Sequence, residues 1–154
     1  VGVKELKELI QFLRKNDIST ISTYLNGFWD DDEAKIRQRA KSVDEIDPDI
    51  VMIQLLNPIP GSPIYRKAMK DNIIEVNNLS LYDLEHCVMP TKHLTRQQLG
   101  ELTGWAFQSF FSKPGRIDRI LNGYSSPYVK MKFLSLKSNA AKYEKGAAED
   151  AVAI

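Results

Sequence analysis

The stretch Val51-Met-Ile-Gln-Leu-Leu-Asn-Pro-Ile-Pro-Gly-Ser-Pro-Ile-Tyr65 decides the fold, because an apolar strand leads directly into a stiff loop and a new helix. Three prolines, Pro58, Pro60 and Pro63, each fix a φ angle and remove an N–H donor. Gly61 leaves one position free to adopt a positive φ. A strand that ends in a loop of fixed shape is typical of a ligand-facing strand end. For the loop itself, a shaped connector between strand and helix is a simpler interpretation than direct contact with a ligand.

Upstream of this stretch, the chain alternates between helical and strand patterns. Apolar residues repeat at helical spacing over 3–13, and residues 18–25 are rich in the β-branched and aromatic residues of strands. The acidic triplet 30–32 supplies an N-cap for a second helix that ends near Ile46. Residues 50–56 are almost continuously apolar, which predicts a strand covered on both faces.

Short connections between alternating helices and strands predict right-handed parallel βα units, an α/β fold. A two-stranded parallel sheet needs cover on both faces and a neighbour at each edge. We therefore expect these units to close something larger, with the N-terminal remainder of the same chain as their partner. The first residue is Val1 rather than Met, which indicates an excised or processed piece.

The second half of the chain is mostly helical. Thr95 and Gln98 form a capping-box pattern, and an apolar stripe follows until Pro114-Gly115. This stripe consists of Leu99, Leu102, Ala106, Phe107 and Phe110. A short helix ending at Asn122-Gly123 and an amphipathic segment over 128–141 come next. We expect most of these aromatic side chains to be core.

Composition excludes several classes of protein. With 21 basic and 20 acidic residues, the chain has no electrostatic bias toward nucleic acid, and no nucleic acid is expected as a partner. The single cysteine, Cys87, allows no internal disulfide and fits a cytoplasmic location. No apolar run approaches the roughly 18 residues of a membrane-spanning helix. His86, Cys87 and His93 match no ligand spacing of a metal site, so no metal ligand is predicted.

A different class of function is suggested by the segment from Lys113 to Lys145. It carries eight Lys and Arg residues against Asp118 and Glu144. Such a basic amphipathic surface suits a non-catalytic interaction module that binds an anionic membrane peripherally, a nucleic acid or a partner protein. A solvated helical face is the simpler interpretation.

Four stretches, in order along the chain, resemble the C-terminal part of a radical S-adenosylmethionine enzyme. They are Ser22 to Gly27, Asp30 to Ala40, Asp44-Glu-Ile-Asp-Pro-Asp49 and the loop Pro58-Ile-Pro-Gly-Ser-Pro-Ile-Tyr65. The class they resemble has a cobalamin-binding N-terminal domain and includes proteins like the anaerobic magnesium-protoporphyrin monomethyl ester cyclase. The resemblance extends roughly from Val3 to Leu121 and rests on pattern.

The resemblance implies a partial TIM-type barrel in which 18–25 and 50–56 are parallel strands. Residues 1–75 would be its closing βα units, 76–145 a helical C-terminal extension and 146–154 a disordered tail. The full enzyme would cleave S-adenosylmethionine at a 4Fe-4S cluster to start radical chemistry on a C–H bond of a small-molecule substrate. Cobalamin would be a further cofactor for methyl-transfer or oxygen-insertion chemistry.

The sequence differs from the family pattern in two places, and these differences limit which functions of the family can be expected of this chain. The Cys-x-x-x-Cys-x-x-Cys motif of the family is absent, and Cys87 cannot replace three thiolates. We therefore expect the isolated chain to hold no cofactor by itself, to contain no catalytic residue and to be inactive. In addition, Phe28-Trp-Asp-Asp31 stands where the family has Pro-Gly-Glu-Thr, so the chemistry of that turn is open.

Six residues at the two strand ends are the predicted cofactor-binding residues. By resemblance they would contact the adenine and ribose of the cofactor. They are Leu25, Asn26 and Gly27 at one strand end and Gln54, Leu56 and Asn57 at the other. Gln54 is the strongest candidate. A buried amide must form hydrogen bonds, because leaving it without a partner lowers the stability of the fold by about 1 to 3 kcal/mol. The alternative is that Gln54 bonds a neighbouring backbone group in the complete barrel.

Overall fold

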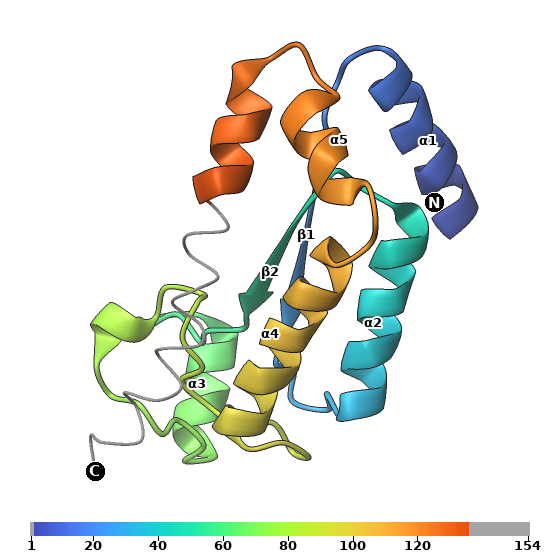
Figure 1. Cartoon of the computed structure of the whole chain (residues 1–154). Coiled ribbons are helices and arrows are strands. Elements are labelled where there is room, and N and C mark those ends of the chain that lie inside the picture. Colours follow the sequence, from blue (N-terminus) through green and yellow to red (C-terminus); the bar gives the residue numbers. More distant parts are fainter. Residues whose placement is uncertain (1, 136–154) are drawn as a thin grey trace.

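The computed structural model describes residues 2–135 and shows an α/β fold (Figure 1). Its elements are α1 (Val3–Lys15), β1 (Ile21–Asn26), α2 (Glu33–Ile46), β2 (Ile50–Leu55), α3 (Pro63–Lys70), the 3-10 turn η1 (Leu79–Leu81), α4 (Arg96–Phe111) and α5 (Arg116–Asn122). Residues 127–135 are also helical. β1 and β2 pair in parallel, from Ile21 beside Ile50 to Asn26 beside Leu55. The predicted parallel strands and the mostly helical second half are confirmed.

The ends of the elements follow from local side-chain hydrogen bonds. Asp32 caps α2 by accepting from the Lys35 N–H at 2.8 Å. Thr95 and Gln98 form the predicted capping box at the start of α4. β1 begins three residues later than predicted, because the Thr20 N–H donates to the Asp49 carboxylate at 2.9 Å and takes no part in strand pairing.

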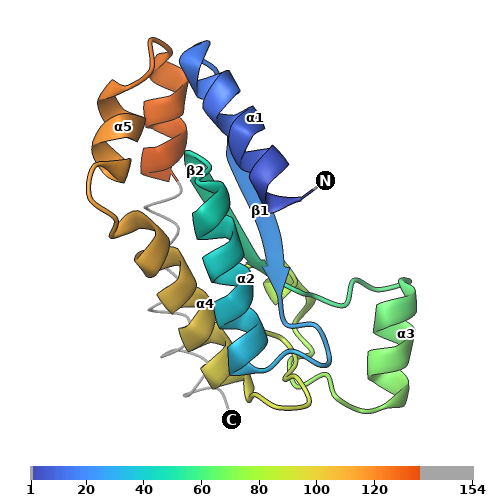
Figure 2. The same cartoon turned by 90° about the vertical axis from the view of Figure 1, so that its right-hand side faces the viewer.

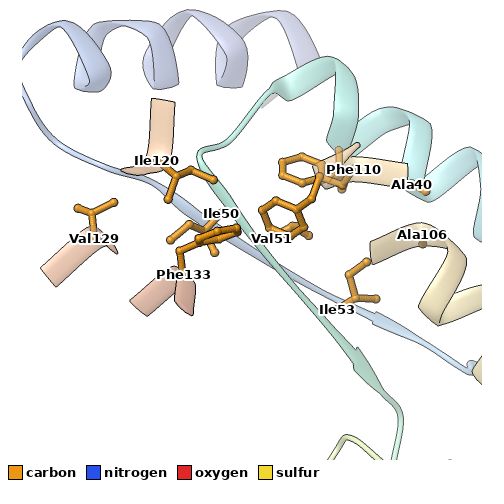
Figure 3. Packing of buried hydrophobic residues seen from close by; sticks show 11 residues of the cluster. Ala40, Ile50, Val51, Ile53, Ala106, Phe110, Ile120, Val129 and Phe133 are labelled. Atoms are coloured by element: carbon orange, nitrogen blue, oxygen red, sulfur yellow. The ribbon is translucent and has the colours of Figure 1, made fainter. Parts of the chain in front are cut away.

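One face of the two-stranded sheet is covered by helices. Figure 2 shows α2 and α4 together on one side of the strands, with α1 beside α2. The main core cluster consists of Ala40, Val43, Ile50, Val51, Ile53, Ala106, Phe110, Phe111, Ile120, Val129 and Phe133 (Figure 3). Segments 1–75 and 76–145 therefore share one core in the described residues.

The other face of the sheet is bare over most of its length. We use "bare face" for the side chains of Ile21, Thr23 and Leu25 on β1 and Met52 and Gln54 on β2. They alternate with residues that point toward the helices, and their own burial is at most partial. Ile50, at the start of β2, shares their face but is buried in the core cluster. In Figure 2, α3 stands apart from the strands, beyond their carboxyl ends.

The predicted cover of both faces of the second strand is only partly present within the described residues: Ile50 is buried, but Met52 and Gln54 on the bare face are half-buried. The contrast between the faces is larger toward β1, where Ile21 on the bare face is 44% exposed, whereas Ile53 on the covered face of β2 is 4% exposed. A continuous apolar run shows that both faces avoid water, but it cannot show which residues provide the cover.

Charged groups join the helices at the opposite, N-terminal ends of the strands. Asp49 is fully buried, and its Oδ1 lies 3.0 Å from Arg14 Nε. Asp47, in the turn before β2, lies 2.7 Å from Arg116 Nη2 and 3.1 Å from Arg119 Nη2. These ion pairs connect α1 and α5 to the turn between α2 and β2.

The charge of Asp47 should make the fold sensitive to acid. Burial raises the pKa of Asp47, but hydrogen bonds from Arg116 and Arg119 outweigh it and leave the pKa below its ordinary value. The resulting stability is present above the pKa of an unfolded aspartate, about 3.9, and is lost as the pH falls through the lower folded-state pKa. We expect the urea midpoint to be level from about pH 7 to about pH 5 and to fall below about pH 4.

Asp47→Asn should flatten this acid decline. Some decline should remain, because the pKa values of Asp17 and Asp83 are lowered as well, the former mainly by the Ser125 hydroxyl. Identical acid slopes for the wild type and Asp47→Asn would contradict the assignment.

Candidate functional site

The candidate site lies where β1 and β2 end. The carboxyl ends of parallel strands share one edge of the sheet, and α/β proteins bind ligands there. Here the edge is formed by Asn26 and Gly27 after β1 and by Leu56 and Asn57 after β2. The Leu56 N–H donates to the Asn26 carbonyl at 2.8 Å, so the two strand ends are held together beyond the sheet.

Asn26 is a structural brace between the sheet and the helices. Its side chain is fully buried. Its Oδ1 accepts from Arg39 Nη1 at 2.7 Å, and its Nδ2 donates to Thr103 Oγ1 of α4 at 3.2 Å. Both ends of the amide are therefore occupied by the protein itself.

The turn after β1 is closed by a second buried carboxylate. Asp31 Oδ2 accepts from the N–H groups of Gly27 and Phe28 at 3.0 and 3.1 Å. Its Oδ1 lies 2.8 Å from Arg39 Nη2. Helix capping, which the sequence suggested for the whole acidic triplet, explains Asp32 but not Asp31.

Asn57 is a second brace, and it clamps a loop that returns to the sheet edge. Its Nδ2 donates to the His86 carbonyl at 2.9 Å, and its Oδ1 accepts from the Leu84 N–H. The Leu55 N–H, at the end of β2, donates to the Leu84 carbonyl at 2.8 Å. The segment around Leu84 therefore runs directly beside the carboxyl end of β2.

Two of the six predicted residues point away from the helices and remain open to a ligand. Leu25 and Gln54 are register partners on the bare face, and both are half-buried. Within residues 2–135 the Gln54 amide has no hydrogen-bond partner, whereas the sequence predicted a buried amide. It is less buried than predicted because this face lacks cover.

The sequence reasoning considered His86 but missed its pairing with a carboxylate in the loop that Asn57 clamps. His86 Nδ1 lies 2.8 Å from Asp83 Oδ2. Burial raises the pKa of Asp83, but hydrogen bonds from the His86 and Glu85 N–H groups outweigh it, and the pKa lies below its ordinary value. The spacing Asp-x-x-His in an irregular segment was the available signal.

The described residues contain no group of three or more His, Cys, Asp and Glu side chains that could hold a metal ion. His93 lies exposed near the start of α4, and the Cys87 thiol donates to the Met89 carbonyl at 3.4 Å. No helix within residues 2–135 has the length and apolar character needed to cross a membrane.

The predicted basic surface is partly used for internal ion pairs. Lys113 and Arg116 both pair with Asp44, and Arg119 pairs with Asp47. Lys130 is exposed. Lys132 is half-buried. The remaining basic residues of that predicted surface, Lys137, Lys142 and Lys145, lie outside the part of the chain that the structure describes.

Two known proteins are distantly similar to this chain in sequence. The chain is 23% identical over 107 residues to an uncharacterized methyltransferase of Pyrococcus horikoshii, covering 70% of the chain and 23% of that protein. It is 27% identical over 128 residues to the anaerobic magnesium-protoporphyrin IX monomethyl ester cyclase of Cereibacter sphaeroides, covering 83% of the chain and 18% of that enzyme. The chain is a distant relative of both.

The chain therefore spans less than a quarter of the length of these curated relatives. No family model matches it. Both similarities are remote, and they agree with the class of enzyme that the sequence patterns resemble.

The turn at Gly27 offers a test of how tightly the strand end is built. Gly27 has φ +97°, and a Cβ there would lie 3.1 Å from Leu99 Cδ2. Gly61 has φ +88° but open space around it. Alanine at either position should cost about 1 to 2 kcal/mol of backbone strain. Gly27→Ala should lower the free energy of unfolding in urea further than Gly61→Ala, and equal losses would contradict the contact.

Proposed function

We propose that this chain supplies the closing βα units of a radical S-adenosylmethionine enzyme. In this proposal β1 and β2 line the cofactor site with their carboxyl ends, and the helical second half covers the outside of the barrel. The observation that carries the proposal is the bare face of a parallel sheet whose other face is fully covered by helices.

A barrel explains why one face is bare. In a TIM-type barrel, helices cover the outside of the strands, and side chains from neighbouring strands fill the inside. The covered face, with Val51 and Ile53, then faces outward to the helices, and the bare face turns inward. Further strands, supplied by the rest of the protein, would pair with the free edge of β1 and cover Ile21 and Leu25.

The distant relatives favour this class of enzyme. One is named a methyltransferase and the other a cyclase, and each is more than four times as long as the aligned segment. The order of sequence motifs from Ser22 to Tyr65 supports the radical S-adenosylmethionine class in particular. The remaining length of such an enzyme would hold the cluster-binding motif and a cobalamin-binding domain.

The residues present fit one part of this cofactor set. Gln54 offers a free amide beside the apolar Leu25, which suits the polar groups and the flat adenine ring of S-adenosylmethionine. One cysteine does not fit a 4Fe-4S cluster, so the cluster ligands would lie elsewhere in the protein. When bound, the cofactor and cluster would supply the radical that activates a substrate C–H bond. The chain's own part is to bind, orient and exclude water.

A matched pair of substitutions tests the barrel. In the isolated chain, Ile53→Ala should cost about 2 to 4 kcal/mol of unfolding free energy, because it opens a cavity in the covered core. Ile21→Ala should cost less than about 1 kcal/mol, because this side chain is already exposed. In the protein made from the complete reading frame, Ile21→Ala should become as damaging as Ile53→Ala. A cost that stays small there would contradict inward placement of the bare face.

S-adenosylmethionine binding tests the site itself. The complete reading frame should encode a Cys-x-x-x-Cys-x-x-Cys motif upstream, and its reconstituted product should bind S-adenosylmethionine in equilibrium dialysis. Gln54→Ala should weaken binding about fivefold, the loss expected for one hydrogen bond. Gln11→Ala, at an exposed position on α1, serves as the control and should bind like the wild type. A product that lacks the motif, or fails to bind, would overturn the proposed function.

A further inference from the structure

We infer that His86 is an additional ligand-binding residue of this site, accepting a hydrogen bond through Nε2 from an O–H or N–H group of the ligand. The inference rests on the proposed function, which supplies the ligand. Its own evidence is the geometry of the loop that joins Asp83 to His86 at the end of β2.

The first observation is the orientation of the imidazole ring. Asp83 Oδ2 lies 2.8 Å from His86 Nδ1. A carboxylate at this nitrogen favours the tautomer with the proton on Nδ1, which leaves a lone pair on Nε2. The negative charge of Asp83 also makes that lone pair a stronger acceptor.

The second observation is that the backbone of the loop is fixed from two sides. Asp83 Oδ1 accepts from the N–H groups of Glu85 and His86 at 2.8 and 2.9 Å. Asn57 holds the Leu84 N–H and the His86 carbonyl from the other side. Leu84 has φ +68°, which is uncommon for a bulky residue and persists only where neighbouring contacts hold it.

The third observation is that the imidazole ring lies at the end of β2 and that, in the described part of the chain, its Nε2 atom is free to accept a hydrogen bond. The loop pairs with the last residue of β2 through Leu84, so His86 lies at the strand end that the proposed site uses. Its side chain is 33% exposed. Within residues 2–135, Nε2 has no hydrogen-bond partner. His93 has no comparable carboxylate contact in the same range, which makes it a matched control.

The chemistry of the ligand is complementary to a lone pair. The adenosine part of S-adenosylmethionine carries ribose hydroxyls and an exocyclic amino group, and both are hydrogen-bond donors. A neutral imidazole with a free Nε2 accepts from either group. Gln54 and His86 would then contact the same cofactor from the sheet face and from the edge loop.

The ring orientation is tested on the 154-residue chain without any ligand. Nitrogen NMR of the labelled chain, above the titration range of histidine, shows which ring nitrogen carries the proton. We expect the Nδ1–H tautomer for His86 and the Nε2–H tautomer of a free side chain for His93. Asp83→Asn keeps an oxygen that can close the turn and should shift His86 toward Nε2–H. The Nε2–H tautomer for His86 in the wild type would overturn the inference.

Ligand contact is tested on the product of the complete reading frame with S-adenosylmethionine as the probe. His86→Gln should weaken binding about tenfold, and His93→Gln should leave it unchanged. Equal affinities for the two variants would overturn the inference while the proposed function stands. If the wild type fails to bind, the proposed function fails and the ligand assignment of His86 falls with it, whereas the NMR result still decides the ring orientation.

Discussion

The fully buried carboxylate of Asp49 is the interaction on which the arrangement of the helices depends. Its two oxygens are satisfied from different parts of the chain, by Arg14 of α1 and by Thr20 before β1. A buried charge is tolerated only when it is paired and hydrogen-bonded, so these elements must meet at one point. Asp47 extends the same cluster to α5. The N-terminal ends of the strands are thereby fixed by charge, and the helical second half is fixed to them.

The carboxyl ends of the strands are held by different chemistry. Asn26 and Asn57 use both ends of their amides on the protein, the first toward Arg39 and Thr103 and the second toward a returning loop. Polar residues at a strand end are therefore not all available to a ligand. The braces leave Gln54 on the bare face, and they place a histidine beside the end of β2. Most polar groups at this end of the strands are therefore fixed by hydrogen bonds within the described residues, and few are left without a partner.

Local patterns in the sequence predicted the elements well, because their causes are local. Asp32 and Thr95 cap helices through residues three positions away, and the parallel strands follow from short βα connections. The roles of Asn26 and Asn57 could not be predicted, since their partners lie up to 77 residues away along the chain. The sequence indicated that the strands need cover from elsewhere in the protein, but it could not show which side chains would lack it. Apolar character records that a face avoids water and carries no information on what covers it.

The charged cluster lies at the N-terminal ends of the strands and the open side chains lie toward their carboxyl ends, and this separation has an evolutionary consequence. Buried ion pairs gather around Asp49, whereas the half-buried Gln54 and the loop that Asn57 holds lie toward the opposite ends of the strands. Replacements among those open residues leave the anchoring cluster intact. A scaffold of this kind can therefore change at its open end while keeping the same architecture.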